Sequence, residues 1–555
     1  MPKTSKIVSQ ITIKLKGNEL DHALTAQLVS VSVDQHAYLP AAFTIQFHDS
    51  DLQILDQGTF NLTDEVEILC ESDDGQQVRL IKGEVVALEP IFGQDMIADL
   101  IITGFDKLHR LYREPHTRAF LNTKDSDIAE QFARDSNLNP QVETTAAVYD
   151  HIFQNTQSDL TFLQQRADRI GFECFADDGK LYFRKPQQPQ AQMTLTWGED
   201  LLTFRPRLSL AEQVEEVIVH GWDVKKKEAI IGRATQANLR PEVSEKASTD
   251  WTRPFGSGKK ILVDQPVGNQ READLLADAR LQEASGAFIV AHGTAFRKPQ
   301  IKAGQWIRLE GLGERLTGNY LVTHAVHTHS AEGLITEFHV TGAKKGTISD
   351  TLHPNAKQNR LPGAIPAIVT NNQDPNKLGR VKVKYPGISD DTESHWARVI
   401  SPGAGDKYGF SLIPEVGDEV MVIFGNGVIN HPYILGGVWN GKTELPPAVK
   451  SASENHKIKA WQTPGGHSIV FYDDNNKKIE ILTNDGRKIT LDDSNKKISI
   501  ETSSCKIELE DQNLTIKAGG KIEIDASNIK LKANGNIEID ASGEVKINGA
   551  IIRLN

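Results

Sequence analysis

The chain of 555 residues is long enough for three or four domains, each with its own hydrophobic core. Its 39% hydrophobic and 25% charged residues are typical of soluble globular proteins, and no apolar run approaches the roughly eighteen residues of a membrane-spanning helix. The net charge of −12 disfavours nonspecific nucleic-acid binding, which requires a basic surface.

The start of the chain, Met1 to Ile7, lacks the apolar core of a secretory signal. We therefore expect synthesis in the cytoplasm and export only as part of a larger assembly. Cys70, Cys174 and Cys505 are scattered, which indicates neither a disulfide framework nor a Cys-x-x-Cys metal site. We interpret all three cysteines as small buried or half-buried side chains.

Residues 7 to about 110 contain short runs in which apolar and polar side chains alternate. Examples are Ile11–Leu15, Phe43–Phe47 and Glu65–Leu69. Turn residues separate these runs at intervals typical of a β-barrel or sandwich.

Two helices are expected next. The first covers Asp125–Asn139, with Asp125 or Ser126 as its N-terminal cap. The second begins at Ser158-Asp159 and stops at Gly171. Four apolar residues share one face of this second helix: Leu160, Leu163, Ala167 and Ile170.

A hairpin is expected after the second helix, because Asp177-Asp-Gly179 separates the runs 172–175 and 180–184. The stretch Ser158-Asp-Leu-Thr-Phe-Leu163, followed by Arg166 and Ile170-Gly-Phe-Glu-Cys-Phe175, resembles the helix-then-hairpin of VgrG-type spike proteins and phage tail hubs. Strands near 215–220, 288–292, 306–309 and 318–329 and a helix at about 270–284 resemble the second barrel of such a hub. The resemblance implies that two barrels per chain build a pseudo-sixfold ring from three subunits, matching the ring of tube protein above it.

Three histidines, His324, His327 and His329, suggest a metal site, because imidazoles are common ligands. His324 points to the opposite strand face from the other two, and no cysteine or carboxylate cluster accompanies them. We therefore expect structural histidines and no bound metal or other cofactor.

Residues 346–360 are polar and without pattern, and we interpret them as a linker. Four motifs follow in order: Ala367–Pro386, Trp396–Val399, Ile413–Val422 and Pro432–Asn440. Together they resemble the OB-fold domain shared by phage baseplate hubs and VgrG proteins, where the domain is a structural collar. The motif positions are Asp374, Gly379, Arg380, Trp396, Pro414, Gly417, Asp418 and Gly436.

From Gly465-Gly466 to the end, apolar pairs recur at a spacing that falls from ten residues to nine and then to seven or eight. Their period-two alternation predicts strands with one buried face. Turn residues such as Asn534-Gly535-Asn536 separate the last repeats. The expected core residues of these repeats are Ile522, Ile524, Ile529, Leu531, Ile537, Ile539, Val545 and Ile547.

One strand of about five residues spans only about 17 Å, so a single repeat cannot curl round to cover its own apolar face. A single-chain β-helix requires coils of twenty residues or more. Three chains wound together would close the coil, which predicts an intertwined trimeric β-helix. Outward residues alternate in sign between successive repeats, as in Glu523/Asp525 and Lys530/Lys532, and this supports stacking in register. The solvated face of an ordinary sheet is the alternative interpretation of these charges.

The sequence therefore predicts a mainly β protein with two hub β-barrels, small α/β insertions, an OB-fold collar and a C-terminal intertwined trimeric β-helix. The expected domains are 1–120 (first barrel), 121–205 (α/β insertion), 206–345 (second barrel and helix), 346–360 (linker), 361–445 (OB fold), 446–468 (neck) and 469–555 (spike).

The resemblance implies a non-enzymatic homotrimeric spike that joins the inner tube of a contractile injection machine to its tip and pierces the target envelope. Implied partners are the inner tube protein, baseplate proteins, effectors or cargo, and a small PAAR-like protein capping the needle; no nucleic acid is expected. Docking of the cap is expected at Ile551, Ile552, Leu554 and Asn555. Phage tails, type VI secretion, extracellular phage-like particles and membrane-anchored particles of this kind all use such a spike, and the absence of a lysozyme or effector domain favours the extracellular particles.

Two rival functions stay open at this point. A polysaccharide lyase or depolymerase with a single-chain β-helix would need longer coils and a groove of acids and aromatics, whereas Phe471 and Tyr472 are the only aromatic residues from about 465 onward. A nucleic-acid-binding OB protein would need a basic aromatic face.

Overall fold

The computed structural model describes residues 10–94, 98–187, 190–211, 213–223, 226–237, 241–243, 258–342, 363–389, 392–452 and 455–553. The chain divides into two compact units, Met1–Val438 (unit 1) and Trp439–Asn555 (unit 2). The expected linker at 346–360 lies outside the described residues, as do Leu554 and Asn555. None of the helices in the described ranges combines the length and apolar character that a membrane span requires.

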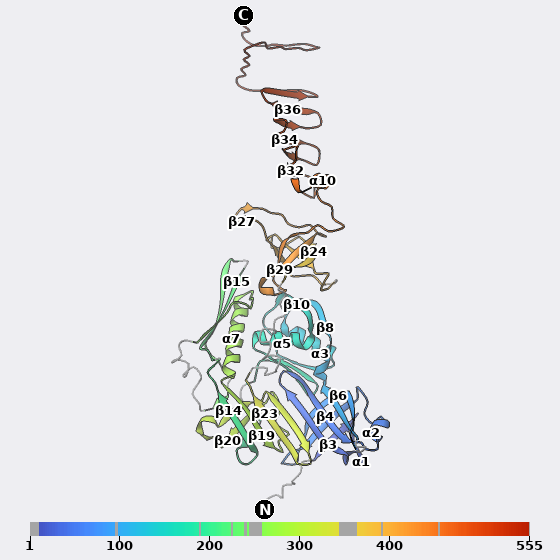
Figure 1. The fold of residues 1–555 in the computed structure, drawn as a ribbon. Coiled ribbons are helices and arrows are strands. Elements are labelled where there is room, and N and C mark those ends of the chain that lie inside the picture. Colours follow the sequence, from blue (N-terminus) through green and yellow to red (C-terminus); the bar gives the residue numbers. More distant parts are fainter. Residues whose placement is uncertain are drawn as a thin grey trace, which may run out of the picture. The chain divides into compact units, whose positions relative to one another are not determined.

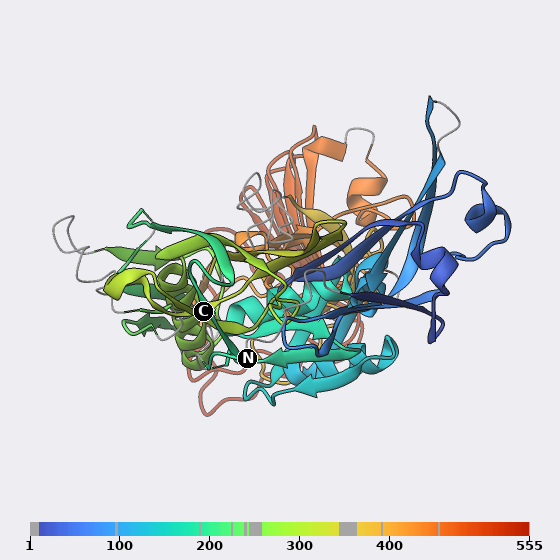
Figure 2. The ribbon, with the colours of Figure 1, turned by 90° about the horizontal axis from the view of Figure 1, so that it is seen from below.

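The main feature of unit 1 is an 11-stranded sheet in the order β14-β19-β23-β22-β3-β4-β7-β6-β5-β1-β2 (Figure 1, Figure 2). Strands from the first barrel predicted by the sequence and strands from the second are continuous in it, because β22 pairs antiparallel with β3. The strands are β1 Ile11–Leu15, β2 Asn18–Glu19, β3 Leu28–His36, β4 Leu39–His48, β5 Glu65–Glu71, β6 Gln77–Phe92, β7 Ala98–Asp106, β14 Leu201–Leu208, β19 Ile289–Phe296, β22 His324–Ser330 and β23 Gly333–Val340.

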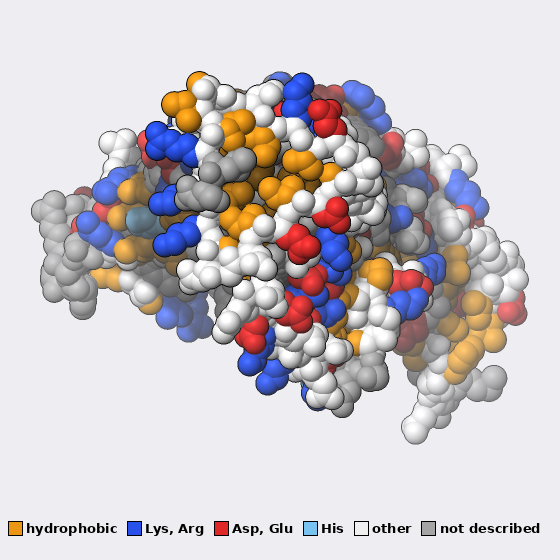
Figure 3. Space-filling view, turned by 90° about the horizontal axis from the view of Figure 1, so that it is seen from above, with side chains coloured by type: hydrophobic (Ala, Val, Ile, Leu, Met, Phe, Trp, Pro, Cys, Tyr) orange, Lys and Arg blue, Asp and Glu red, His pale blue; other side chains and the backbone are white. Residues whose placement is uncertain are grey.

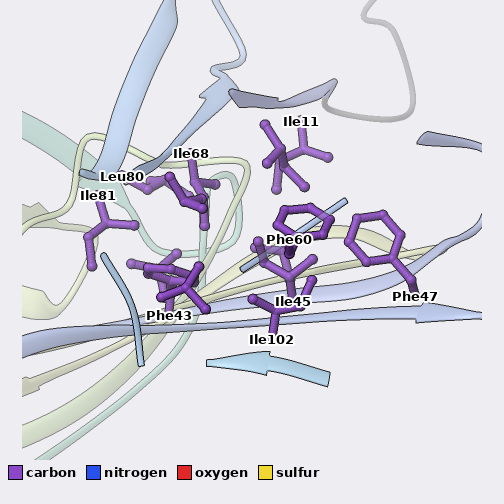
Figure 4. Packing of buried hydrophobic residues seen from close by; sticks show 14 of the residues in the cluster. Ile11, Phe43, Ile45, Phe47, Phe60, Ile68, Leu80, Ile81 and Ile102 are labelled. Carbon is purple, nitrogen blue, oxygen red and sulfur yellow. The ribbon is translucent and has the colours of Figure 1, made fainter. Parts of the chain in front are cut away.

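The first half of this sheet has an aromatic and aliphatic core. Alternate residues of β3 and β4, among them Val33, Phe43 and Ile45, are fully buried. Figure 4 shows Phe43, Ile45, Phe47 and Phe60 packed with Ile68 and Ile102 of neighbouring strands. The opposite side chains of the same strands are partly open to solvent, so this region of the sheet has one core face and one open face.

The helices of unit 1 follow the predicted pattern with one correction. α5 (Asp159–Ile170) begins at the Ser158 cap, whose hydroxyl accepts from the Thr161 N–H, and ends at Gly171 in the left-handed conformation (φ 69°). Its predicted apolar stripe is buried. α7 (Gln270–Gly286) covers the predicted range.

The predicted cap and end of the first helix are wrong. α4 covers Asp125–Asp135 and is preceded by Lys124 as the cap residue, whose backbone N–H donates to the Asp127 carboxylate (3.2 Å). Asp125 is the first helical residue and its carboxylate instead binds the Arg166 guanidinium (2.5 Å). The helix ends early because the chain enters strand β9 (Asn139–Val142).

The remaining elements of unit 1 are short. Strand β11 (Glu173–Asp177) and β12 (Lys180–Arg184) form the predicted hairpin around Asp178 and Gly179. The others are α1 His22–Thr25, α2 Gln53–Asp56, η2 Lys107–His109, α3 Arg110–Arg113, β8 Pro115–Thr123, β10 Tyr149–Ser158, β13 Met193–Thr196, β15 Glu216–Asp223, β16 Glu228–Ala234, β17 Glu242–Val243, β18 Lys259–Leu262, β20 Trp306–Glu310, α8 Gly313–Leu316 and β21 Gly318–Leu321.

The predicted OB domain is a closed five-stranded barrel in the order β24-β25-β26-β30-β29, which confirms the prediction. Its core includes Val369, Val383 and Val422. The elements are β24 Ile365–Asn371, β25 Arg380–Lys384, β26 Ala397–Val399, β29 Glu419–Phe424 and β30 Pro432–Gly437, with the hairpin β27 Ala404–Gly405 and β28 Tyr408–Gly409 and the turn η4 Gly425–Gly427.

Unit 2 contains one seven-stranded sheet, β31 to β37, in sequential order. The sheet begins at Ile458, within the predicted neck, where α10 (Pro447–Lys450) and η5 (Asn455–Lys457) also lie. The strands are β31 Ile458–Gln462, β32 Ser468–Tyr472, β33 Lys478–Leu482, β34 Lys488–Asp492, β35 Lys497–Glu501, β36 Cys505–Glu510 and β37 Asn513–Ala518.

Candidate functional site

The sheet of unit 2 is an antiparallel meander formed by a single chain, which the sequence pattern did not reveal. Each strand pairs with the next in an unbroken register, from Ile458↔Tyr472 through Leu509↔Leu514. The connections shorten along the chain: 463–467, 473–477 and 483–487 have five residues, and 493–496, 502–504 and 511–512 have four, three and two. This shortening is the physical basis of the falling repeat length.

Two rows of apolar side chains run across one face of this sheet, which we call the apolar face. Residues that pair directly across strands lie on the same face, and so do residues two apart in one strand. The first row is Ile469, Ile481, Ile489, Ile500, Ile507 and Ile516, and the second is Phe471, Ile479, Leu491, Ile498, Leu509 and Leu514.

The apolar face is open in the single chain. Ten of its twelve side chains are exposed, with exposed fractions from 38% at Ile489 to 63% at Leu514. Figure 3 shows hydrophobic side chains at the surface close to groups of acidic and basic ones. Exposed apolar surfaces of this extent mark interaction sites in soluble proteins.

The other face of the sheet, the charged face, carries a ladder of ion pairs. Lys488 lies 3.5 Å from Glu480 and 3.2 Å from Glu501, and Lys497 lies 2.6 Å from Glu508. Lys478 and Lys506 extend the ladder through Glu480 and Glu508. Burial opposes ionisation of Glu480, but the hydrogen bond from Lys478 and the charges of Lys478 and Lys488 hold its pKa below the ordinary value.

The order of charges along each strand favours the antiparallel arrangement. β34 and β35 each begin with lysine and end with an acid. Antiparallel pairing places Lys488 opposite Glu501 and Asp492 opposite Lys497, whereas parallel pairing would place like charges together. This signal was present in the sequence and could have predicted the direction of pairing.

The last four repeats, residues 519–553, form no strand in the single chain. Their predicted core residues are strongly exposed, for example Ile524 at 68% and Leu531 at 74%. Of the predicted tip residues, Ile551 and Ile552 are exposed, and Leu554 and Asn555 lie outside the described residues. The intertwined β-helix stays a prediction, because its strands are expected to pair between chains.

Asp374 organises the predicted OB motif. Its carboxylate accepts from both Nε and Nη2 of Arg380 (2.9 and 2.7 Å) and from the backbone N–H groups of Asn376 and Leu378 (3.0 and 2.9 Å). Its side chain is only 3% exposed. The hydrogen bonds from Arg380 hold the pKa of Asp374 far below its usual range. This ion pair fixes the loop that leads into β25.

The other motif positions also stabilise turns and strands of the OB barrel. Gly379 and Gly417 have positive φ angles of 67° and 97°, which favour glycine. The Asp418 carboxylate accepts from the Glu415 N–H (2.9 Å), and the Pro414 carbonyl accepts from the Asn372 amide (3.3 Å). The remaining positions are Trp396, whose ring lies 5.7 Å from the Arg380 guanidinium, and Gly436, which pairs with Met421 across β29 and β30.

The three histidines considered as metal ligands are placed as the alternation predicts. His327 is buried and its Nδ1 lies 2.9 Å from the Thr336 hydroxyl, whereas His324 is on the opposite face. Burial lowers the pKa of His327 to about 3. No group of three or more histidine, cysteine or acidic side chains suited to a metal exists among the described residues. Cys70 and Cys174 are buried as predicted, but Cys505 is exposed on β36, which corrects that prediction.

Unit 1 also contains a cavity of about 510 Å³ whose lining includes residues of α5 and α7 and residues 428–430 of the OB domain. Its charged lining is balanced, since four cationic residues, Lys260, Arg166, Arg169 and Arg280, face four acidic ones, Asp168, Glu173, Asp264 and Glu283.

Two protein families match this chain. The family described as the Alg8 N-terminal domain matches residues 5–331, and the type VI secretion system/phage-baseplate injector OB domain matches residues 365–439. The second match covers the closed barrel built around Asp374 and Arg380.

Curated relatives share a shorter segment. The type VI secretion system spike protein VgrG4b of Pseudomonas aeruginosa is 35% identical over 95 residues, which is 16% of this chain and 12% of the relative. VgrG3 of Vibrio cholerae, also a type VI secretion system spike protein, is 31% identical over 112 residues, or 19% of this chain and 11% of the relative. The matched segment therefore spans about an eighth of these relatives.

A solved structure extends the likeness to most of the chain. A chain in the lidded Francisella PdpA-VgrG complex has a TM-score of 0.50 and 10% identity, and the alignment covers 92% of this chain and 81% of that one. At this identity the likeness concerns the fold alone.

Proposed function

Since the chain belongs to the family of the Alg8 N-terminal domain and is a spike protein of the VgrG type, we propose that it is the homotrimeric spike at the tip of a contractile injection machine. Three copies would supply a hub from unit 1, a collar from the OB barrel and a needle from unit 2. The spike would join the inner tube and baseplate proteins to a tip protein and pierce the target envelope mechanically.

The observation that carries this proposal is the open apolar face of β31–β37. Complete burial of one isoleucine, leucine or phenylalanine side chain stabilises a protein by roughly 1.5–3 kcal/mol, and the exposed residues of the apolar face are about half exposed. Ten such side chains in each chain therefore leave a large favourable free energy unused until a partner covers them. Two further copies of the same sheet would form a three-sided prism with all three apolar faces inward.

Residues 519–553 need the same partners for a different reason. Their backbone forms no strand within the chain, yet their apolar and polar residues alternate as in the sheet before them. Backbone groups buried without hydrogen-bond partners are costly, so we infer that these strands pair with strands of the other two copies. A needle closed in this way has no free sheet edge along its shaft, which suits it to mechanical load.

The oligomeric state in solution tests this proposal directly. Light scattering from the purified full-length chain is expected to give a mass near three times 61.3 kDa. Dilution into the nanomolar range should leave the trimer intact, because the buried apolar area is large. A stable monomer at micromolar concentration would overturn the proposal.

The end of the chain is proposed to hold the tip protein. Ile551 and Ile552 are 75% and 52% exposed, and three copies would present six such side chains at a blunt end. We expect deletion of residues 545–555 to abolish capture of a PAAR-like cap while the trimer persists. Capture that survives this deletion would contradict the tip assignment and leave the trimeric spike standing.

A further inference from the structure

Four histidines form one row across the open face of the 11-stranded sheet. His292 on β19 pairs with His339 on β23, His339 pairs with His324 on β22, and His324 pairs with His36 on β3. Directly paired residues point to the same side of a sheet, so all four imidazoles lie on the face opposite the core. The sequence separates the first and last of them by more than half of unit 1, so only the folded sheet brings them together.

The rings are close enough to interact. The ring centroids of His292 and His339 lie 4.7 Å apart, those of His339 and His324 lie 5.0 Å apart, and those of His324 and His36 lie 5.2 Å apart. Two of the rings make hydrogen bonds whose direction follows from the partner. His324 Nε2 lies 2.7 Å from the Asp34 carboxylate and donates to it, and His36 Nδ1 accepts from the Tyr38 backbone N–H (3.2 Å).

The charged groups that face this row are few. Asp34 on β3 and Glu337 on β23 supply two negative charges, and the Glu337 carboxylate is 3.8 Å from His292. Arg205 on β14 pairs directly with His292 and adds a positive charge at one end, with Arg207 two residues further along that strand. On β4 the residue opposite His36 is Leu39, and the histidine further along that strand, His48, binds Asp99 of β7 (3.0 Å).

The row also crosses a structural seam. β3 belongs to the N-terminal half of the sheet, and β22, β23 and β19 belong to the half formed after residue 288. The pairing of β22 with β3, over His324–His329 and Val31–His36, joins the two halves within the sheet. The contact between the imidazoles of His324 and His36 lies directly on this seam.

We propose that the histidine row is an acid-sensitive device that loosens the β22–β3 seam between the two halves of the hub sheet. The imidazoles of His324 on β22 and His36 on β3 are in contact across the seam, tilted by 40° to one another. When the row takes up more protons than Asp34 and Glu337 can balance, like charges face one another at ring-centroid distances of 4.7 to 5.2 Å. The proposal concerns unit 1 alone and does not depend on the trimeric spike.

Proton uptake in this row is coupled from ring to ring. Partial burial and the charges of His324 and His292 lower the pKa of His339. A proton on His324 or His292 therefore makes protonation of His339 less favourable. Protonation of His36 at Nδ1 also removes the acceptor of the Tyr38 N–H, at the turn that connects β3 with β4. The first effect acts on the β22–β23 side of the seam and the second on the β3 side.

Amide hydrogen exchange of the full-length protein tests the proposal. The amides of β22 and of residues 31–36 report on the seam, and those of β1 and β5 in the same sheet serve as the internal reference because no histidine lies in either strand. After correction for the intrinsic exchange rate at each pH, protection at the seam should fall about tenfold more than protection in the reference strands between pH 7.5 and 5.0. An equal fall in both regions would overturn the proposal.

Two variants separate the row from other histidines. In the double variant His324→Gln, His339→Gln, amide side chains keep hydrogen-bonding capacity but take no proton, and the fall at the seam should shrink to about the reference value. His327→Gln removes the buried histidine on the other face of β22 and should leave the difference between the seam and the reference in place, although the stability of unit 1 as a whole becomes less dependent on pH. If the fall survives the double variant, or disappears only with His327→Gln, the row is not the sensor. His292→Gln, at the exposed end, should reduce the fall partially and replaces the double variant if that protein does not fold.

Discussion

Unit 1 and unit 2 bury their hydrophobic residues to very different extents. Unit 1 has five separate clusters of buried hydrophobic residues, each formed within one chain. In the described part of unit 2, only Ile458 and Val470 are buried hydrophobic residues. A single chain therefore buries the hydrophobic cores of unit 1 by itself. In unit 2 the sequence supplies apolar side chains, but the single chain has too few neighbouring residues to bury them.

A second comparison, within unit 2, explains where the chain needs its partners most. The connections between β31 and β37 shorten until 511–512 has two residues, and two residues are the shortest connection that reverses a β-strand. The meander therefore cannot tighten further. The repeats after Ala518 recur every seven or eight residues, as β36 and β37 do, but they form no strand within the single chain, and for them we propose partners in other chains.

The largest expected effect comes from a charge on the apolar face. Ile516 and Thr515 are adjacent, and Ile516 lies on the apolar face whereas Thr515 lies on the charged face opposite Glu508. Ile516→Lys would bring three ammonium groups toward the axis of the proposed prism, where burial of an unpaired charge is strongly unfavourable. We expect light scattering to show loss of the trimer at micromolar concentration.

Thr515→Lys is the matched control, because it adds the same charge one residue away on the other face. It should leave the mass and the far-ultraviolet circular dichroism unchanged.

Limited trypsin digestion of the Ile516→Lys protein tests the difference between the meander β31–β37 and the repeats that follow it. Cleavage at Lys521, Lys530 and Lys532 should be fast in the monomer, whereas lysines within β33–β36 stay protected by their intrachain pairing. Equal cleavage of both segments would contradict the distinction between them.

A smaller effect is expected in unit 1, where the OB barrel completes itself. Asp374→Ala removes the partner of Arg380, whose side chain is only 11% exposed. Loss of one partner of a buried ion pair typically costs about 3–5 kcal/mol. Denaturant unfolding should show this loss in unit 1, with the trimer mass unchanged. Asp418→Ala, which removes one turn hydrogen bond, should cost about 1 kcal/mol and serves as the graded control.

Much of the fold was predictable because local patterns determine it. Ser158 and Gly171 bound α5 through their own side-chain and backbone preferences, and the alternation in β3 and β4 predicted the buried face. The motif residues of the OB barrel were recognised for the same reason. Their hydrogen bonds, such as those of Asp374, are made within a few residues of the chain.

Features that depend on distant partners were not predictable from these patterns. Asp125 was one of two residues expected to cap α4, but its carboxylate binds Arg166, which lies 41 residues later in the chain. The seam between β22 and β3 joins strands about 290 residues apart, and with it the histidine row. The meander of unit 2 was missed because period-two alternation does not report strand direction, although the lysine-to-acid order of β34 and β35 did.

The smallest expected effect is a difference in acid response between the two units. Burial lowers the pKa of His327 from 6.5 to about 3, so the unfolded chain binds a proton that the folded unit excludes, and unit 1 loses stability as pH falls below about 6.5. At pH 5 this single histidine lowers the free energy of unfolding of unit 1 by roughly 2 kcal/mol.

In unit 2 the pKa of Glu480 is lowered by its lysine partners despite its burial. The stability that Glu480 contributes to unit 2 is therefore lost only below about pH 4.5. Thermal unfolding at pH 7.5 and 5.0 should therefore lower the transition of unit 1 and leave that of unit 2 in place. His327→Gln should remove about 2 kcal/mol of this dependence. A transition of unit 2 that falls first would show that the needle, and not the self-contained hub, is the acid-sensitive part.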